Sequence, residues 1–576
     1  MKVLLTAVNA KYIHSNLAVY DLRAYAEAYG TGGAQVEIGE YTINHTIDYI
    51  LEGIYKAKPD VLCFSCYIWN LDYVEQLMDE YHKICPEVSI WVGGPEVSYE
   101  TEAFLKEHPQ VTGVMVGEGE ETFLELCESY AKAGIGEMAE KMNLSGIKGI
   151  MYRAGESLVK TGVREPLDLN RIPFCYGGVE DFRNRIIYYE SSRGCPFRCS
   201  YCLSSVEKTL RFRDVERVKK ELAFFLEQEV AQVKFVDRTF NCRHEHAMEI
   251  WKFLIEHDNG VTNFHFEISA DLLTDEEIAL IGQMRPGLIQ LEIGVQSTND
   301  ATITEIHRTM QLDRLKAVVR SIQEKENIHE HLDLIAGLPY EGYETFARSF
   351  DEIYALKPNQ LQLGFLKVLK GSYMYEHATE YGLIYRSRPP YEVLKTNWLG
   401  FGEILRIRQV EEMLEVYYNS GQYATAIRLL ETQYASAFAM FAELGTFYEE
   451  HGYFGMGHSR MRRAEILLEF AKERRPGVLP VLGEGLVYDL YERENLGSRP
   501  AWAADANEWK QMTRQYGKNG KQSHIERFFY RFSGHRQDTA SLPERLEDPV
   551  YVRFDYTRRD PLDHQAQHEY LEYSGE

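Results

Sequence analysis

The stretch that decides the fold is Cys195-Pro196-Phe197-Arg198-Cys199-Ser200-Tyr201-Cys202, in which three cysteines follow the spacing C-x3-C-x2-C. It comes shortly after the apolar run Ile186-Ile187-Tyr188-Tyr189. Three thiolates on one short loop can hold three irons of a [4Fe-4S] cluster, whereas a ferredoxin-type cluster uses four cysteines. The fourth iron then has no protein ligand. We therefore interpret Cys195, Cys199 and Cys202 as the metal ligands of a cluster with one open position.

Two other interpretations of these cysteines stay open. A structural zinc loop would normally show a fourth Cys or His nearby, and a chance spacing is conceivable because the chain contains 9 cysteines. Polar residues at the ends of later strands favour the cluster. The spacing resembles the signature of the radical S-adenosylmethionine (SAM) superfamily, in which the amine and carboxylate of SAM chelate the open iron.

The bulk composition indicates a globular protein of several domains. The chain has 576 residues, 44% of them hydrophobic and 26% charged, and it contains no run of about eighteen apolar residues that would cross a membrane. An expected first strand at Lys2 leaves no room for a signal peptide, and an odd number of cysteines fits a reducing compartment. We therefore expect a cytoplasmic protein. The net charge of −25 disfavours a broad nucleic-acid surface.

Residues 1–145 alternate short apolar runs with helical patterns. The expected strands are 3–5, 36–38, 61–64, 90–92 and 114–116, and the expected helices are 17–29, 47–57, 71–84, 97–105 and 122–131. Five such units predict a doubly wound, flavodoxin-like (Rossmann-like) α/β domain with a parallel sheet. Ligands of such sheets bind beyond the carboxyl ends of the strands. The residues to inspect there are Ser65, Gly93, Gly94, Gly117 and Glu118.

This domain, placed directly before the cysteine loop, resembles the cobalamin-binding domain of the cobalamin-dependent (B12-binding) radical SAM family. Val-Gly-Gly-Pro-Glu at 92–96 and Val-Gly-Glu-Gly-Glu at 116–120 look like the fourth and fifth loops of that family. The resemblance implies cobalamin as a cofactor. The Asp-x-His-x-x-Gly pattern that places a histidine under cobalt is missing at His14, so we expect either cobalt without a His ligand or a domain that has lost cobalamin.

Residues 146–180 predict a hairpin followed by a linker, and residues 181–370 predict a second α/β domain. Its expected strands are 186–189, 233–236, 264–268, 289–293, 332–335 and 361–365. Six units suit the partial (β/α)6 TIM-type barrel that the radical SAM resemblance implies, with chemistry at the carboxyl ends of the strands. Polar residues do gather there, among them Asp237, Thr239, Glu267, Gln296 and Asp333.

The stretches around these residues resemble the radical SAM branch that includes oxygen-independent coproporphyrinogen oxidase. Carried over, the resemblance places Tyr189 beside the cluster and SAM, and Glu267 on the methionine ammonium. It places Gln296 and Asp333 on the ribose and Arg308 near the carboxylate. The contacts of Asp237 and Thr239 stay open, because Val-Asp-Arg-Thr-Phe-Asn at 236–241 replaces the turn of many relatives.

Several other residues have a structural interpretation. Cys63 and Cys66 are expected to be small buried residues of a strand, and Cys175 and Cys242 to be incidental thiols, although a thiol near the site could give a hydrogen atom to a substrate radical. His244 and His246 are expected at the start of a solvated helix. Residues 371–576 predict a mainly helical accessory domain, which resembles a domain of unknown function in one branch of the family.

The resemblance implies that a reduced cluster cleaves SAM to a 5′-deoxyadenosyl radical, which activates an unreactive C–H bond for methyl transfer from methylcobalamin. Three alternatives are open: cyclisation or rearrangement, tRNA modification of the methylthiotransferase kind, and a non-enzymatic iron-sulfur sensor. We expect a reductant such as flavodoxin or ferredoxin, and a small-molecule substrate in preference to tRNA. The sequence does not name the substrate.

Overall fold

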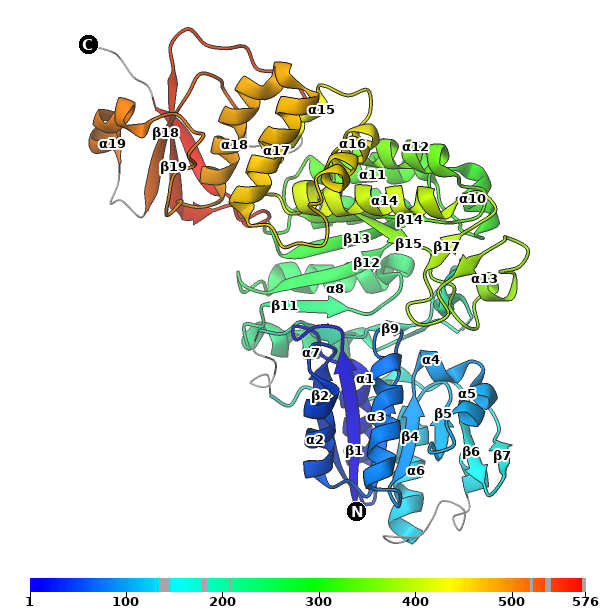
Figure 1. The fold of residues 1–576 in the computed structure, drawn as a ribbon. Coiled ribbons are helices and arrows are strands. Elements are labelled where there is room, and N and C mark those ends of the chain that lie inside the picture. Colours follow the sequence, from blue (N-terminus) through cyan, green and yellow to red (C-terminus); the bar gives the residue numbers. More distant parts are fainter. Residues whose placement is uncertain are drawn as a thin grey trace. The chain divides into compact units, whose positions relative to one another are not determined.

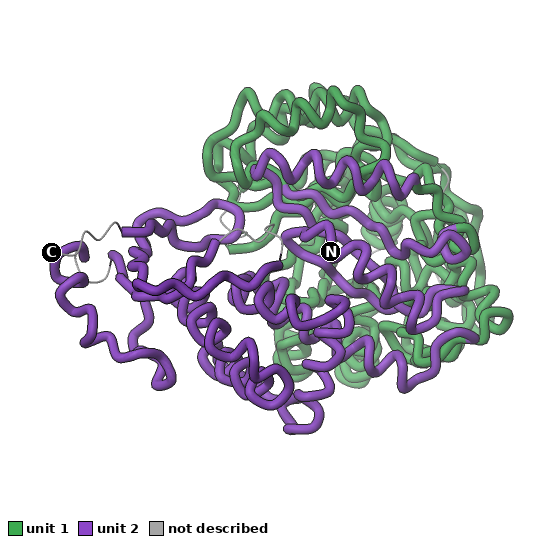
Figure 2. Tube along the Cα trace, turned by 90° about the horizontal axis from the view of Figure 1, so that it is seen from above, with its two compact units in different colours: residues 1–289, 304–310, 366–396 green, residues 290–303, 311–365, 397–576 purple. Residues whose placement is uncertain are grey.

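The computed structural model describes residues 1–133, 144–178, 182, 184–206, 209–517, 522–533 and 540–571. The chain forms two compact units, which Figure 2 colours separately. Unit 1 comprises Met1–Ile289, Thr304–Met310 and Leu366–Thr396, and unit 2 comprises Gln290–Ile303, Gln311–Phe365 and Asn397–Glu576. Each unit is described by itself below.

Unit 1 begins with a seven-stranded sheet in the order β2-β1-β3-β4-β5-β6-β7. The strands are β1 (Lys2–Asn9), β2 (Gln35–Thr42), β3 (Val61–Ser65), β4 (Ser89–Gly93), β5 (Gly113–Met115), β6 (Ile150–Ala154) and β7 (Ser157–Lys160). The first five are parallel. Their order is that of flavodoxin-like folds, so the predicted doubly wound domain is confirmed.

Helices cover both faces of this sheet (Figure 1). They are α1 (Leu17–Tyr29), α2 (Ile47–Ala57), α3 (Leu71–Ile84), α4 (Pro95–Ser98), α5 (Thr101–Glu107) and α6 (Glu120–Ala133). α2 packs against α3, and α1 against α6. The core between sheet and helices includes the fully buried Val8, Leu62 and Ile54. Apolar strands with amphipathic helices on both sides produce this layering, because each buried face needs a partner.

The hairpin expected after residue 145 is present as β6 and β7, and it continues the first sheet. β6 pairs antiparallel with β5, from Gly113 opposite Tyr152 to Met115 opposite Ile150. The hairpin is thereby joined to the first domain. The expected boundary at residues 180–181 lies outside the described residues.

The second α/β region supplies three parallel strands to each unit. Unit 1 holds β8 (Ile187–Tyr189), β11 (Gln232–Phe235) and β12 (Asn263–Ile268), with β11 in the middle, and α7 (Val215–Glu227), α8 (His244–Glu256) and α9 (Asp275–Ile281). Unit 2 holds β13 (Ile289–Gln296), β14 (His329–Ala336) and β15 (Gln360–Phe365), with β14 in the middle, and α10 (Asp300–Glu305), α11 (Leu312–Gln323) and α12 (Tyr343–Tyr354). The predicted alternation of six strands with helices is confirmed.

Short elements complete unit 1. They are β9 (Ser192–Arg193), β10 (Arg211–Phe212), α13 (Tyr373–Glu376), β16 (Ile384–Tyr385) and β17 (Val393–Lys395). β9 and β10 pair antiparallel on either side of the cysteine loop.

The C-terminal part of unit 2 is mainly helical, as predicted, and ends in a small sheet. Its helices are α14 (Phe401–Leu414), α15 (Ala424–Glu431), α16 (Ala437–Glu450), α17 (Arg460–Arg474), α18 (Leu479–Arg493) and α19 (Lys510–Tyr516). The antiparallel strands β18 (Ser523–Phe528), β19 (Val550–Arg559) and β20 (Ala566–Leu571) follow. Within the described ranges, no helix combines the length and apolar character needed to span a bilayer.

Candidate cofactor site

The cysteine loop is held from two sides by backbone hydrogen bonds. Ser200 N donates to Ile306 O at 2.9 Å, and Ser200 O accepts from Met374 N at 3.0 Å. Within the loop, Cys202 N donates to Cys199 O at 3.1 Å, which closes a turn. Cys199 is buried, whereas Cys195 and Cys202 are half-buried. The three thiols therefore sit on a clamped loop and none of them is in a disulfide.

The donor set, three cysteine thiols on one short loop, fits an iron-sulfur cluster. Burial raises the pKa of Cys195, and the thiols of Cys202 and Cys199 raise it further, so the three lie within electrostatic reach of one another. Among the described residues, no three His, Cys, Asp or Glu side chains surround one metal position. A cubane binds each thiolate through a different iron, and three thiolates would leave its fourth iron without a protein ligand.

The segment leading into the loop is anchored to the end of β11. The buried Asp237 carboxylate accepts hydrogen bonds from Ser191 N at 3.0 Å, Ser191 Oγ at 3.1 Å and Ser192 Oγ at 2.5 Å. Burial raises the pKa of Asp237 to about 7. Two residues later, Thr239 Oγ1 lies 3.6 Å from Cys195 Sγ. Asp237 and Thr239, whose contacts the sequence left open, thus meet the cysteine loop itself.

The expectation that His244 and His246 start a solvated helix is correct only in part. α8 does begin at His244, but His246 is buried and its Nε2 lies 3.1 Å from Ser191 Oγ. Burial, reinforced by Arg243, lowers the pKa of His246 to about 4. The charged neighbours Arg243 and Glu245 suggested a solvated segment, but the His246 ring packs against Phe212.

Cys242, expected to be incidental, lies near the loop. Burial raises the pKa of Cys242 to about 11, and the thiol of Cys195 contributes to that shift. The two thiols are therefore electrostatic neighbours.

Arg308 lies against the cysteine loop. Its Nη1 is 3.7 Å from Cys199 Sγ and 3.4 Å from Tyr201 Oη. A guanidinium beside a thiolate ligand favours the negatively charged form of that ligand. The position is compatible with a contact to a carboxylate bound at the cluster, and it also gives Arg308 a direct influence on Cys199.

Tyr189 points away from the face on which Glu267 lies. Its hydroxyl donates to Glu221 Oε2 at 2.6 Å, and its ring packs edge-on against Phe225 of α7. On β12, Phe266 is buried on the helix side, so the alternation of a strand puts Glu267 on the other face. Only the backbone of Tyr189 remains for the expected contact with cluster and SAM.

The side chains on the same face of the strands as Glu267 include residues that the sequence analysis did not single out. Tyr188, Lys234 and His265 alternate with buried apolar neighbours, as Glu267 does. The Tyr188 hydroxyl lies 2.7 Å from His14 Nδ1. Burial, Lys11 and Lys234 lower the pKa of His14. The pattern that could have identified them is the period of two in a strand, which puts a polar residue at every second position of β8, β11 and β12.

In unit 2, Gln296 carries two marks of a ligand-binding residue. Its backbone adopts φ +74° at a bulge of β13, and its side-chain Oε1 is buried without a hydrogen-bond donor among the described residues. Strained backbone and an unsatisfied buried acceptor both cost free energy, and both concentrate at functional sites. Asp333 lies opposite Gly294 on the adjacent β14, with His331 Nε2 3.1 Å from its Oδ1.

The turn after Gln296 is fixed by a buried carboxyl group. Glu341 accepts from Ser297 Oγ at 2.6 Å and from Ser349 Oγ at 2.9 Å. Burial raises the pKa of Glu341 to about 7. A carboxyl group whose pKa is raised on folding stabilises the fold at low pH, and the contribution is lost as the pH rises through the folded-state pKa.

We therefore expect local stability around β13 to fall as the pH rises from about 4.5 to about 7, by roughly 3 kcal/mol at most. The Glu341→Gln variant keeps a neutral group there and should lack this pH dependence. Amide hydrogen exchange of residues 289–297 and 341–350, corrected for intrinsic rates, measures the difference. An identical pH trend in both proteins would contradict the assignment.

The expected cobalamin loops lie together at one edge of the first sheet. Cys66 N donates to Gly93 O at 2.7 Å. Gly94 has φ +114°, and a Cβ there would lie 2.5 Å from Cys66 O, so only glycine fits. Ser65 Oγ accepts from Asn16 Nδ2 at 3.0 Å. Gly117 has φ +83° with open space around it. As expected, Cys63 and Cys66 are both buried, but only Cys63 lies in β3, and Cys66 directly follows that strand.

Aromatic rings accompany these loops, and the sequence analysis did not assign them a role. Tyr67 and Trp69 stack with their centroids 4.4 Å apart and their planes 7° apart. Trp69 is 41% exposed, and Tyr12 in the first loop is 59% exposed. Flat exposed rings beyond the strand ends suit a large planar ligand. Aromatic residues directly after a strand end were the available signal.

An ionic cluster links the fifth loop of the first sheet to the cysteine loop. Glu118 accepts from Leu167 N at 2.8 Å and from Arg211 Nη1 at 3.1 Å. Arg193, two residues before Cys195, lies 3.3 Å from Glu118 and 2.8 Å from Glu120. Burial favours the neutral acid, but Arg211 and Arg193 outweigh it and lower the pKa of Glu118. We therefore expect the Glu118 carboxylate to position the loop whose backbone would meet the cofactor.

Three family models match successive parts of the chain. The B12 binding domain matches residues 3–127, the radical SAM superfamily residues 189–353, and a family of proteins of unknown function (DUF4080) residues 379–542. The expected accessory domain of unknown function is thereby confirmed.

Curated relatives resemble about half of the chain. The 2-(S-pantetheinyl)-carbapenam-3-carboxylate methyltransferase of Streptantibioticus cattleyicolor is 27% identical over 52% of this chain and 46% of that protein. The cobalamin-dependent radical SAM methyltransferase TokK of Streptomyces tokunonensis is 27% identical over 56% of this chain and 49% of its own. The anaerobic magnesium-protoporphyrin IX monomethyl ester cyclase of Rubrivivax gelatinosus is 23% identical over 57% and 60%. The chain spans about half the length of the curated relatives it matches.

Solved structures share the fold. The cobalamin-dependent SAM radical enzyme OxsB with aqua-cobalamin bound superposes with a TM-score of 0.59 at 16% identity, over 85% of this chain and 80% of that one. The radical SAM methyltransferase TsrM of Kitasatospora setae, with cobalamin and a [4Fe-4S] cluster, gives 0.55 at 15% identity, over 67% and 79%. The chain therefore combines a B12-binding domain, a radical SAM domain and a C-terminal DUF4080 region, the arrangement that its resemblance to the cobalamin-dependent (B12-binding) radical SAM family implies.

Proposed function

We propose that this chain is a cobalamin-dependent radical SAM methyltransferase acting at an unreactive carbon. The observation that carries the proposal is the position of Arg193, which precedes the cluster cysteines and is bonded to Glu118 and Glu120 of the fifth B12-domain loop. A methyl donor and a radical generator have to address the same carbon, so their loops need a fixed relation. When bound, the cluster, SAM and cobalamin supply an electron, a hydrogen-abstracting radical and a methyl group.

The residues of the chain bind and orient these groups. Cys195, Cys199 and Cys202 hold the cluster, while Asp237 fixes the approach to their loop. The SAM contacts expected of Glu267, Gln296, Asp333 and Arg308 are part of the proposal, and the orphaned amide oxygen of Gln296 supports one of them. The glycines of the fourth and fifth loops let backbone approach a corrin ring, and the Tyr188 hydroxyl contacts His14.

Two products test the proposal. Anaerobically reconstituted protein, given SAM, reductant and its substrate, should form 5′-deoxyadenosine and S-adenosylhomocysteine in equal amounts, because one SAM yields the radical and another the methyl group. Ring formation, the reaction for which the matched magnesium-protoporphyrin cyclases are named, should give deoxyadenosine without S-adenosylhomocysteine. Absence of deoxyadenosine would overturn the radical mechanism.

The partner and the substrate are part of the same proposal. Radical SAM proteins need a reductant, and we propose flavodoxin or ferredoxin in the cytoplasm, where a reducing environment protects the cluster. A small molecule fits the net charge of −25 better than tRNA. Comparison of metabolites and modified nucleosides in cells with and without the gene would identify the substrate.

Arg308 offers a test that separates a role at the cluster from a role in SAM binding. Replacing Arg308 by Met should lower the reduction potential of the cluster by about 60–130 mV, because a hydrogen bond from a charged donor is worth about 1.5–3 kcal/mol and stabilises the reduced form. The measurement is a redox titration without SAM. Arg285→Met, which removes a guanidinium paired with Asp258, is the control. An unchanged potential in Arg308→Met would restrict Arg308 to SAM.

A further inference from the structure

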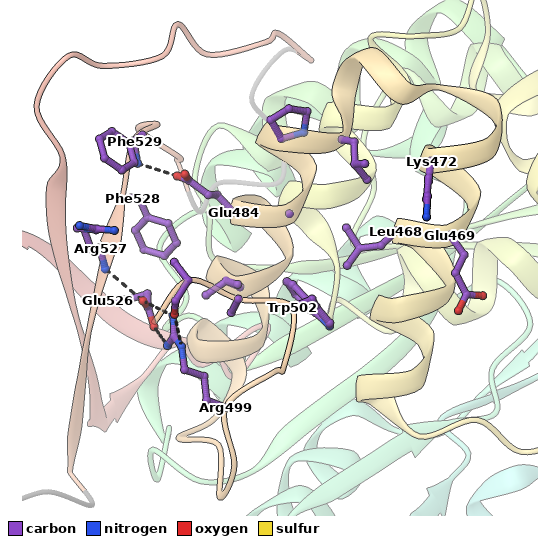
Figure 3. Close-up of a pocket in the computed structure, with 16 residues that line it drawn as sticks. Leu468, Glu469, Lys472, Glu484, Arg499, Trp502, Glu526, Arg527, Phe528 and Phe529 are labelled. Atoms are coloured by element: carbon purple, nitrogen blue, oxygen red, sulfur yellow. Dashed lines mark hydrogen bonds and ion pairs between the residues drawn. The ribbon is translucent and has the colours of Figure 1, made fainter. Parts of the chain in front are cut away.

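A cavity of about 480 Å³ lies within the C-terminal region of unit 2. Figure 3 shows its walls: Leu468, Glu469 and Lys472 come from α17, Glu484 comes from α18, and residues 526–529 come from β18 and the turn after it. Trp502 comes from the segment that follows α18. The volume falls within the range of small-molecule sites, about 300–1,000 Å³. All of its lining residues belong to one compact unit.

The body of the cavity is apolar. Leu468, Leu479 and Val487 line it together with the rings of Trp502 and Phe528. Gly483 on α18 adds open space, since a Cβ there would meet no atom within 4 Å. Walls of branched aliphatic and aromatic side chains favour a rigid apolar ligand, because such a ligand loses little conformational entropy on binding.

Most charged groups of the lining already have partners. Arg499 Nη2 donates to Glu526 Oε1 at 2.9 Å, and Arg527 Nη2 lies 2.7 Å from Glu508. Glu469 and Glu484 are occupied as well: Arg462 donates to the first at 2.7 Å and Phe529 N to the second at 2.7 Å. The ion pairs Arg499–Glu526, Arg527–Glu508 and Arg462–Glu469 balance their own charges, and a backbone N–H satisfies Glu484, so these groups need no partner from a ligand.

Two donors in the lining are different. The indole N–H of Trp502 is buried and has no acceptor among the described residues. Lys472 forms no ion pair within the described part of the chain, although it lines the same cavity. A buried donor without an acceptor costs about 1–3 kcal/mol, which an incoming acceptor would recover. A neutral donor and an unpaired cation together select an anionic acceptor.

We propose that this cavity binds a small, rigid, apolar carboxylate. Its ring or branched body fills the space beside Leu468, Val487 and Phe528, and its carboxylate accepts from the Trp502 indole and faces the Lys472 ammonium. The site belongs to the DUF4080 region, and it is independent of the reaction proposed above. It gives this region a binding activity of its own.

Calorimetric titration of the full-length protein with naphthalene-2-carboxylate tests the site. Naphthalene-2-methanol serves as the neutral analogue of the same shape. We expect saturable binding of one carboxylate per chain, with the neutral analogue bound at least about tenfold more weakly, since a charge-assisted hydrogen bond is lost. Equal affinity for the two probes would overturn the anionic assignment. No saturable binding of either would overturn the site.

Three variants place the binding in the cavity. Gly483→Leu should abolish binding by filling the open space, and it should not reduce the thermal midpoint, because leucine favours a helix more than glycine does. Gly402→Leu makes the same change in α14 where a Cβ also meets nothing within 4 Å, and it should bind normally. Trp502→Phe should weaken carboxylate binding about tenfold and weaken binding of the neutral analogue less, because the hydroxyl of that analogue accepts only a neutral hydrogen bond from the indole. Unaltered binding in Gly483→Leu would contradict the proposal.

Discussion

Replacing Cys199 by Ala is expected to reduce 5′-deoxyadenosine formation to the background of a protein-free reaction. Cys199 is the buried member of the three thiols, in the turn closed by Cys202 N. With two thiolates left, a cubane has two irons without protein ligands, and the chemistry belongs to the cluster rather than to the polypeptide. Iron and sulfide content per chain, visible absorption and deoxyadenosine after anaerobic reconstitution measure the effect.

The chain offers a matched control in Cys242→Ala. Cys242 is an electrostatic neighbour of Cys195, so loss of its thiol probes whether any nearby sulfur can serve as a ligand. We expect this variant to keep its cluster and to change the rate or the product at most. Full deoxyadenosine formation by Cys199→Ala would refute the ligand assignment. Loss of the cluster in Cys242→Ala would mean that the open iron is capped by a fourth thiolate.

The Gly194→Ala variant should fail to retain its cluster, although it removes no ligand. Gly194 precedes Cys195 with φ +99°, and a Cβ there would lie 2.5 Å from Thr209 O. The new methyl group would push apart β9 and β10, the strand pair that closes the cysteine loop. A positive φ alone costs a non-glycine residue about 1–2 kcal/mol, and the clash with backbone adds to it.

The Gly260→Ala variant separates the effect of backbone strain at a positive φ from the effect of a steric clash of the new Cβ. Gly260 also has a positive φ, +76°, but a Cβ there would meet nothing within 4 Å. That variant should lose about 1 kcal/mol of stability and bind a full complement of iron. The comparison is iron per folded chain for the two variants, with folding followed by circular dichroism. Equal iron content would show that the loop tolerates the displacement and that Gly194 is not required.

The sequence predicted the elements that depend on local pattern. Strands such as 61–65 and helices such as 71–84 agree with the expectation because apolar spacing determines both the element and its buried face. The cysteine loop was recognisable because its ligands lie within eight residues. The bounds of α18 could not be placed from the sequence because Pro480, Gly483 and Gly485 resemble helix breakers. In the structure the proline occupies the first turn, and Gly485 lets Leu429 approach closely.

Features that depend on distant partners could not be predicted. Glu118 was expected to contact cobalamin, and only the fold shows that Arg211 and Leu167 already occupy its carboxylate. The direction of the Tyr189 side chain follows from the phase of a three-residue strand, which is too short to read from alternation. The strained backbone of Gln296 has no signature in the residue type, because φ is set by the bulge in β13.

The backbone contact between the first loop and the second α/β region limits how the B12-binding domain can be exchanged. Ile186 N donates to Ile13 O at 2.7 Å, and Ser15 Oγ donates to Ile186 O at 3.1 Å. A chimaera that takes residues 1–178 from a relative would receive that relative's first loop without the segment at residue 186 to which the loop is hydrogen-bonded. A graft that keeps these hydrogen bonds has to carry residues 186–189 together with the domain. The unit that can be exchanged therefore ends within the second α/β region, beyond the end of the first sheet.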